Sequence, residues 1–117
     1  MRKVSVILNT YRRPEALKLQ YEAVTTQSVI PTEVLLWKNH PEDDTEFDFE
    51  GIDGVAIAQH NANYGVWARF AFALNTCSDY ICVFDDDTIP GKNWFRNCID
   101  CIENENQGLY GTNGVTF

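Results

Sequence analysis

Residues 80–94 read YICVFDDDTIPGKNW, an apolar run that ends on three consecutive aspartates. The run from Tyr80 to Phe84 is short, rich in aromatic and β-branched residues and bounded by polar ones, which predicts a buried strand. The acids Asp85, Asp86 and Asp87 follow at its carboxyl end. Beyond Pro90-Gly91, the segment from Asn93 to about Asn104 is predicted to be a helix. A strand that ends on acids and leads into a helix is typical of a layered α/β fold.

Upstream of this stretch, apolar runs and polar loops alternate in the same way. Three further strands are predicted, at Val4 to Leu8, Glu33 to Trp37 and Val55 to Ala58. Two further helices are predicted, at Glu15 to about Thr26, directly after Pro14, and at Val66 to Asn75. Lys38 to Gly54 is predicted to be a solvated loop, and Leu109 to Phe117 a further strand or hairpin. The alternation predicts an α/β fold with a mainly parallel, Rossmann-like sheet and helices on both faces.

The polar loops that follow the predicted strands are expected to meet, although they are far apart in the sequence. In open parallel sheets, ligands bind in the crevice beyond the carboxyl ends of the strands. The loops concerned are Asn9 to Arg13, Lys38 to His40, Gln59 to Gly65 and Asp85 to Asp87. The sequence therefore predicts a ligand site at one edge of the sheet.

The acidic triplet has an electrostatic cost that a bound cation would offset. Unit charges 4 Å apart interact by about 4 kcal/mol at an effective dielectric of about 20. In an extended segment, Asp85 and Asp87 face one side and Asp86 the other. Carboxylate oxygens suit magnesium or manganese, which take their other ligands from water and phosphate. The alternative is a solvated turn before Pro90-Gly91.

Composition limits the classes of function. The chain of 117 residues fits a single domain, and its net charge of −8 argues against a nucleic-acid partner. The apolar runs are too short for a transmembrane segment, and the amino terminus lacks the apolar stretch of a signal peptide, so a cytoplasmic location is expected. The Cys98-x-x-Cys101 pair has no second pair at zinc-ligand spacing, so the four cysteines are expected to be buried structural thiols. The oligomeric state is not predicted.

Three segments resemble the nucleotide-sugar glycosyltransferases with the GT-A fold. Val4 to Leu17, VSVILNTYRRPEAL, is similar to the opening strand and loop of that family. Asn63-Tyr64-Gly65, followed by Arg69, is similar to its N-x-G-x-x-x-A-R-N stretch. Tyr80 to Trp94 resembles its fourth strand, its D-x-D motif and the P-x-x-W that follows. The three segments occur in the family's order, between about Lys3 and Ile102.

The resemblance implies a metal-dependent enzyme that uses Mn²⁺ or Mg²⁺. Such an enzyme transfers a sugar from a UDP- or GDP-linked donor to a glycan or another acceptor hydroxyl. By this resemblance Asp87, with Asp85, coordinates the metal on the β-phosphate, while Asp85 and Asp86 contact the ribose or the sugar. The other implied nucleotide-sugar-binding residues are Thr10, Tyr11 and Arg13 in the base and ribose pocket, Arg69 at the phosphates or ribose, and Asn63 and Gly65, which shape its loop.

Two departures from the family pattern affect the expected site. The family commonly has an acidic D-x-G-S loop after the second strand, where this chain has Lys38-Asn39-His40-Pro41; Asn39 is expected to bind the base or ribose instead. The family's acceptor-binding part, which supplies the catalytic base, follows the D-x-D motif. Here Asp100, Glu103 and Glu105 are explained as helix-surface charges, so the catalytic residue is unknown. Residues 1–117 are thus expected to form one GT-A-like domain without the acceptor-binding part.

Three other functions are considered. A phosphorelay receiver domain has its acidic pair after the first strand, where this chain has Asn9-Thr10. A haloacid-dehalogenase-type phosphatase also carries its D-x-D motif after the first strand, with Thr one position later than Thr88. Both are disfavoured. A non-catalytic nucleotide- or sugar-binding module derived from the glycosyltransferase fold is the remaining alternative.

Overall fold

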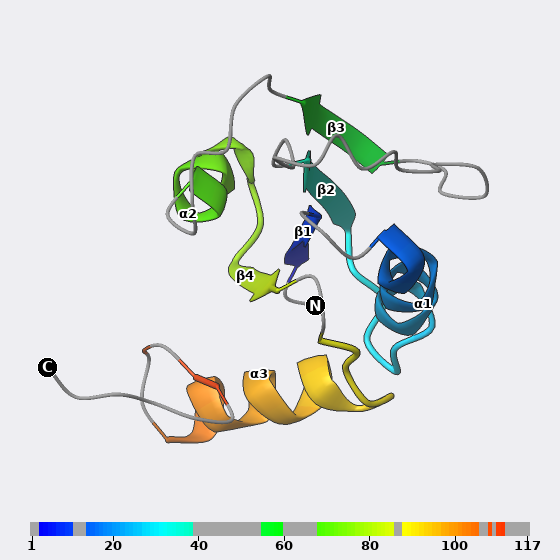
Figure 1. The fold of residues 1–117 in the computed structure, drawn as a ribbon. Helices are drawn as coiled ribbons and strands as arrows, with labels where there is room; N and C mark the ends of the chain where they lie inside the picture. The colour runs from blue at the N-terminus through cyan, green and yellow to red at the C-terminus, as the bar shows by residue number, and fades with distance from the viewer. Residues whose placement is uncertain are drawn as a thin grey trace, which may run out of the picture.

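A computed structural model describes residues 3–10, 14–38, 55–59, 68–85, 88–105, 108 and 110–111. Within these ranges the chain alternates between strands and helices in the predicted order (Figure 1). The elements are β1 (Val4–Thr10), α1 (Pro14–Thr25), β2 (Glu33–Lys38), β3 (Val55–Gln59), α2 (Ala68–Phe72), the 3₁₀ turn η1 (Ala73–Asn75), β4 (Tyr80–Phe84) and α3 (Trp94–Asn104). The predicted α/β class is therefore confirmed.

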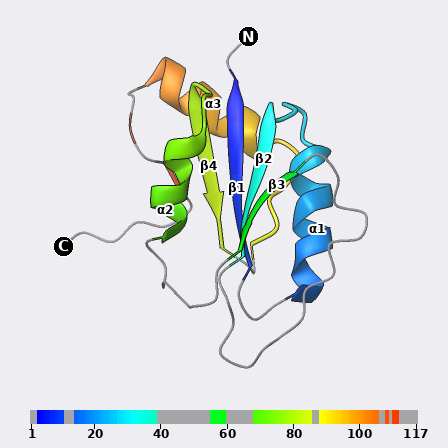
Figure 2. The same cartoon turned by 90° about the horizontal axis from the view of Figure 1, so that it is seen from above.

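The four described strands form one parallel sheet in the order β3-β2-β1-β4. Leu8 of β1 is in register with Leu36 of β2 on one side and with Phe84 of β4 on the other. Seen from above, the strands point the same way, so their carboxyl ends share one edge (Figure 2). The polar residues that follow the strands begin at this carboxyl edge.

Helices cover both faces of the sheet, as predicted (Figure 1). Helices α1 and α3 lie on one face, and α2 lies on the other. None of these helices, within the described ranges, is both long and apolar enough to cross a membrane.

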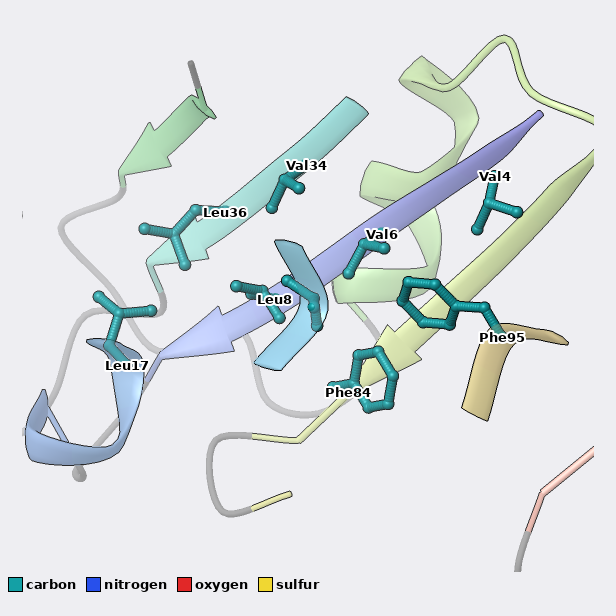
Figure 3. Packing of buried hydrophobic residues seen from close by; sticks show 9 residues of the cluster. Val4, Val6, Leu8, Leu17, Val34, Leu36, Phe84 and Phe95 are labelled. Carbon is teal, nitrogen blue, oxygen red and sulfur yellow. The ribbon is translucent and has the colours of Figure 1, made fainter. Parts of the chain in front are cut away.

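The main hydrophobic core lies between the sheet and the α1–α3 face (Figure 3). Side chains alternate between the two faces along β1, so Val4, Val6 and Leu8 all project into this core and are at most 1% exposed. Phe95 of α3 packs against Phe84 of β4, with ring centroids 6.1 Å apart. The other buried members of the core are Leu17, Val24, Val34 and Leu36. Burial of each such side chain stabilises the fold by roughly 1.5–3 kcal/mol.

The opposite face is packed by the alternate residues of the same strands. Ser5, Ile7 and Asn9 of β1 are 0%, 0% and 3% exposed. The ring of Trp37, which is in register with Asn9, lies 5.4 Å from the ring of Phe72 in α2, centroid to centroid. Helix α2 is therefore packed directly on this face, near the carboxyl edge.

Several element boundaries differ from the sequence-based expectation, and the end of β1 and the helix after β3 differ most. β1 continues through Asn9 and Thr10, which were predicted to be loop, because both residues pair with Trp37 and Lys38 of β2. The helix predicted to run from Val66 to Asn75 is shorter in its described part: α2 ends at Phe72 and the chain tightens into η1. The Thr76 N–H donates to the Ala73 carbonyl at 3.1 Å, a tight closure that is common at helix ends. Residues 39–54 and most of 109–117 lie outside the described residues.

The cysteines are free thiols in the structure, but they are less buried than expected. Cys77 is exposed, and Cys82, Cys98 and Cys101 are half-buried. Burial, followed by the proximity of Cys98, raises the pKa of the Cys82 thiol to about 12. Burial also raises the pKa of Cys98. The half-buried Cys82 and Cys98 are therefore protonated at neutral pH, which fits a packing role.

Candidate functional site

A cation and an acid from different elements meet at the carboxyl edge of the sheet. Arg69 lies in α2, and Asp85 is the first residue after β4. Nη1 of the Arg69 guanidinium donates a hydrogen bond to Oδ1 of the Asp85 carboxylate, and the two groups form an ion pair. The contact brings together two of the residues that the resemblance implies for the nucleotide-sugar site, and their roles there stay predictions.

The two partners of this ion pair differ in their exposure to solvent. The Arg69 side chain is 10% exposed, whereas the Asp85 side chain is 64% exposed. Burying a guanidinium is costly unless a carboxylate or phosphate compensates its charge. Asp85 supplies that compensation and still presents carboxylate surface to the solvent. The pair therefore combines a buried guanidinium with an accessible acid.

A backbone hydrogen bond joins the two ends of the acidic segment. The Thr88 N–H donates to the Asp85 carbonyl at 3.3 Å, a bond between residues three apart. Asp86 and Asp87 come between these residues in the sequence and lie outside the described residues. Among the described residues, no group of three His, Cys, Asp or Glu side chains could hold a metal. Asp85 is thus the described member of the predicted metal-binding pair, and the role of Asp87 stays a prediction.

Two buried glutamines, Gln20 in α1 and Gln27 just beyond its end, hold the chain that follows β4. Gln20 is 0% exposed, and its Nε2 donates to the carbonyls of Asp85 and Thr88, the latter at 2.8 Å. Gln27 is 2% exposed, and its Nε2 donates to the Gly91 carbonyl at 2.5 Å. Gln27 Oε1 also accepts the backbone N–H of Phe95 at 3.2 Å. α1 and the residues directly after it therefore anchor both ends of the segment between the acids and α3.

Neither glutamine was predicted to be a site residue. The available signal was their spacing: Leu17, Gln20 and Val24 share one face of α1, and Gln27 continues the same spacing just beyond the end of the helix. A polar residue on an otherwise apolar helical face has to find a hydrogen-bond partner in the core. The spacing thus predicts buried amides, although it does not predict what they bind.

The other predicted site residues are described only in part. Thr10 ends β1 and is in register with Lys38, the last residue of β2, and Lys38 is in register with Gln59 of β3. The backbones that lead to these loops therefore meet at the carboxyl edge, as expected. The predicted residues outside the described ranges are Tyr11, Arg13, Asn39, Asn63, Gly65, Asp86 and Asp87.

Asn9 is a further polar residue at this edge. Its side chain is 3% exposed, and its Oδ1 has no hydrogen-bond partner among the residues that the structure describes. It is in register with Trp37 and lies one residue beyond the Leu8–Phe84 pair, at the level where β4 gives way to Asp85.

Comparison with protein families identifies this architecture. The family described as Glycosyl transferase family 2 matches residues 5–117. A comparison with curated protein sequences finds no match.

Solved structures of TarS from S. aureus share the fold. A crystal structure of TarS aligns with a TM-score of 0.70 and 18% identity, over 87% of this chain and 20% of the TarS chain. The structure of TarS residues 1–349 aligns with a TM-score of 0.68 and 19% identity, and the same fragment in complex with UDP with 0.69 and 18%. In both of these, 87% of this chain matches 32% of the TarS fragment. The chain therefore spans a third or less of the length of these structures.

Proposed function

The chain belongs to glycosyl transferase family 2, and from that premise we propose that it binds a nucleoside-diphosphate sugar together with a divalent cation. The binding site is the carboxyl edge of the sheet, around Arg69 and Asp85. The proposed activity is transfer of the sugar to an acceptor hydroxyl. The proposal extends the family membership to a substrate class and a site.

The observation that carries the proposal is the contact between Arg69 and Asp85. A guanidinium offers several planar N–H donors, which match the oxygens of a phosphate group. The exposed carboxylate of Asp85 can accept a sugar or ribose hydroxyl, or bind a cation. A diphosphate sugar presents these two kinds of group close together. The guanidinium thus suits the diphosphate of such a donor, and the carboxylate suits one of its hydroxyl groups or a bound cation.

One described residue offers a ligand that suits a divalent cation. The Asp85 carboxylate is 64% exposed at the carboxyl edge, and its oxygens are the hard ligands that Mn²⁺ and Mg²⁺ prefer. Asp87, which shares the D-x-D spacing, is proposed as the second protein ligand. When bound, such a cation stabilises the negative charge that grows on the departing diphosphate.

The proposed reaction is a direct displacement at the anomeric carbon of the donor sugar. The acceptor oxygen forms a bond to this carbon, the bond to the β-phosphate oxygen breaks, and the electron pair leaves with the nucleoside diphosphate. A base outside the described residues takes the proton of the acceptor hydroxyl. Arg69 holds a negatively charged donor group, and Asp85 orients the donor by accepting a hydroxyl or through the cation. Both residues bind and orient the donor, and neither is proposed as the base.

A nucleotide panel tests the proposal. The midpoint of thermal unfolding is measured with UDP, GDP, CDP and ADP, each with and without Mn²⁺. A ligand at 100 times its dissociation constant adds about 2.7 kcal/mol of stability, which raises the midpoint by several degrees. We expect a shift with one nucleotide and only with Mn²⁺ present; UDP is the first to test because TarS was solved in complex with it. Equal midpoints in all eight mixtures would contradict the proposal.

A further inference from the structure

The amide of Gln20 bridges the two ends of the acidic turn from inside the core. Gln20 is fully buried on α1, and its Nε2 donates to the carbonyls of Asp85 and Thr88. These residues lie 65 and 68 positions further along the chain. Asp86 and Asp87 fall between the two carbonyls in the sequence. One side chain therefore fixes the backbone on both sides of the acids.

The chemistry of a primary amide suits this bridge. The NH₂ group has two N–H donors, and each reaches one of the two carbonyls. The Asp85 carbonyl also accepts the Thr88 N–H at 3.3 Å. The same oxygen is therefore bonded both to Thr88 and to Gln20 of α1. Both hydrogen bonds are partly buried, and removal of the amide takes one donor from each carbonyl and opens it to competition from water. Gln20 thus helps to hold the two carbonyls in place.

Packing alone does not explain a glutamine at this position. Leu17 and Val24, its neighbours on the same helical face, belong to the apolar core. Gln20 Oε1 is buried and has no hydrogen-bond partner among the residues that the structure describes. Burying a polar atom without a partner opposes folding, whereas an apolar residue at this position would add to the core. The hydrogen bonds that the amide donates to the chain after β4 therefore account for a glutamine at this position.

We propose that Gln20 is a positioning residue that sets the backbone of the acidic segment for binding the cation and the donor. This inference rests on the proposed function. Asp85 emerges from a carbonyl that Gln20 holds, and its carboxylate meets Arg69 in the adjacent helix. With its backbone carbonyl held in this way, Asp85 keeps its carboxylate beside Arg69 before a cation arrives. Supporting hydrogen bonds of this kind commonly change metal affinity by about 10- to 100-fold.

Gln27, two residues beyond the end of α1, provides a matched control. It is also a glutamine and is 2% exposed. Its Nε2 donates to the carbonyls of Ala23 and Gly91, at 3.0 Å and 2.5 Å, and its Oε1 accepts the Phe95 N–H. These contacts hold the entry to α3, beyond the acids. A general weakening of the fold should affect both glutamines alike, while a role at the acids should distinguish Gln20.

The first test compares Gln20→Met with Gln27→Met. Methionine keeps the unbranched shape of glutamine and removes its donors. UDP binding is measured by calorimetry across a Mn²⁺ titration, and urea unfolding gives the stability of each variant. We expect Gln20→Met to raise the Mn²⁺ concentration for half-maximal UDP binding by about tenfold or more. Gln27→Met should stay within about twofold of the original protein at a similar loss of stability.

A second test needs no ligand. Hydrogen exchange of the backbone amides reports whether the turn stays closed. In Gln20→Met the amide of Thr88 should exchange faster, and in Gln27→Met the amide of Phe95 should do so instead. Equal effects of both variants on Mn²⁺-dependent binding, or an unchanged Thr88 amide in Gln20→Met, would overturn the positioning role. If the original protein binds no nucleotide with Mn²⁺, the proposed function fails and the donor-site role of Gln20 fails with it. If the original protein binds and Gln20→Met binds equally well, the inference about Gln20 fails and the proposed function stands.

Discussion

The guanidinium of Arg69 and the carboxylate of Asp85 form an ion pair that joins α2 to the end of β4. The two residues come from different layers of the fold: α2 covers one face of the sheet, and β4 is a strand of that sheet (Figure 1). Because Arg69 is buried and Asp85 is exposed, the contact depends on Asp85 for charge compensation and leaves that acid within reach of a ligand. The proposed donor site is built around this asymmetry.

Replacing Arg69 by Lys should weaken nucleotide binding while leaving the fold intact. Lysine keeps the charge but lacks the planar set of donors that matches a phosphate. We expect the affinity for UDP with Mn²⁺ to fall by about tenfold, which corresponds to about 1.4 kcal/mol. Calorimetric titration measures this change, and Arg96→Lys on α3 is the control. An unchanged affinity in Arg69→Lys would exclude Arg69 from the donor site.

Replacing Asp85 by Asn should destabilise the protein in the absence of any ligand. The substitution keeps the size of the side chain and removes the charge that compensates Arg69. We expect the free energy of unfolding to fall by about 1–3 kcal/mol, less than for a fully buried pair because Asp85 is exposed. Urea unfolding provides the measurement. Asp100→Asn, an exposed acid on α3, should change stability by no more than about 0.5 kcal/mol. Equal effects of the two substitutions would show that the Arg69–Asp85 contact contributes no stability.

Stability should decline in alkaline solution because of Cys82. Its pKa is raised from 9.0 to about 12 in the folded protein, chiefly by burial. Between these two values the unfolded chain releases a proton that the folded chain retains, so rising pH favours unfolding. The contribution of Cys82 is thus complete below about pH 9 and falls by up to about 1.4 kcal/mol per pH unit above it.

Urea unfolding at pH 7 to 10 measures this decline. Cys82→Ala should flatten the profile above pH 9, although Cys98, whose pKa is also raised, adds a decline of the same sign. Cys77→Ala is the control because Cys77 is exposed. An identical alkaline decline in Cys82→Ala and in the original protein would contradict the assignment.

Two leucines test the position of the core. Leu17 on α1 is 1% exposed, whereas Leu74 in η1 is 88% exposed. Leu17→Ala should cost about 2–5 kcal/mol of unfolding free energy because it leaves a cavity beneath β1. Leu74→Ala should change stability by no more than about 0.5 kcal/mol. Chemical denaturation of the two variants provides the comparison. A larger loss of unfolding free energy in Leu74→Ala than in Leu17→Ala would contradict a core between α1 and the sheet.

Several elements could be predicted closely because their sequences carry local signals. Tyr80 to Phe84 has the bounds that its apolar pattern predicts, and α3 begins one residue later than expected. The end of β1 was predicted wrongly, because Asn9 and Thr10 are polar and their strand conformation comes from pairing with β2. Local propensity is overridden there by a neighbouring strand.

The candidate site was predictable at the level of loops, and less so at the level of contacts. The parallel order of the strands predicts that the chain after β4 lies near the residues that lead into α2, and the Arg69–Asp85 contact agrees. Gln20 was missed because its partners lie 65 and 68 residues away, and a helical repeat specifies which face is buried without specifying what covers it. The roles of Tyr11, Arg13 and Asp87 stay predictions.

Calorimetric titration of the protein with UDP, carried out with and without Mn²⁺, tests the central claim most directly. We predict saturable binding with one UDP per chain when Mn²⁺ is present, and binding at least about tenfold weaker when it is absent, because the acids need a cation before they can accept a diphosphate. Equally strong binding in both titrations would contradict a cation site at Asp85. Failure of UDP and of every other nucleoside diphosphate to bind would contradict the donor site as a whole.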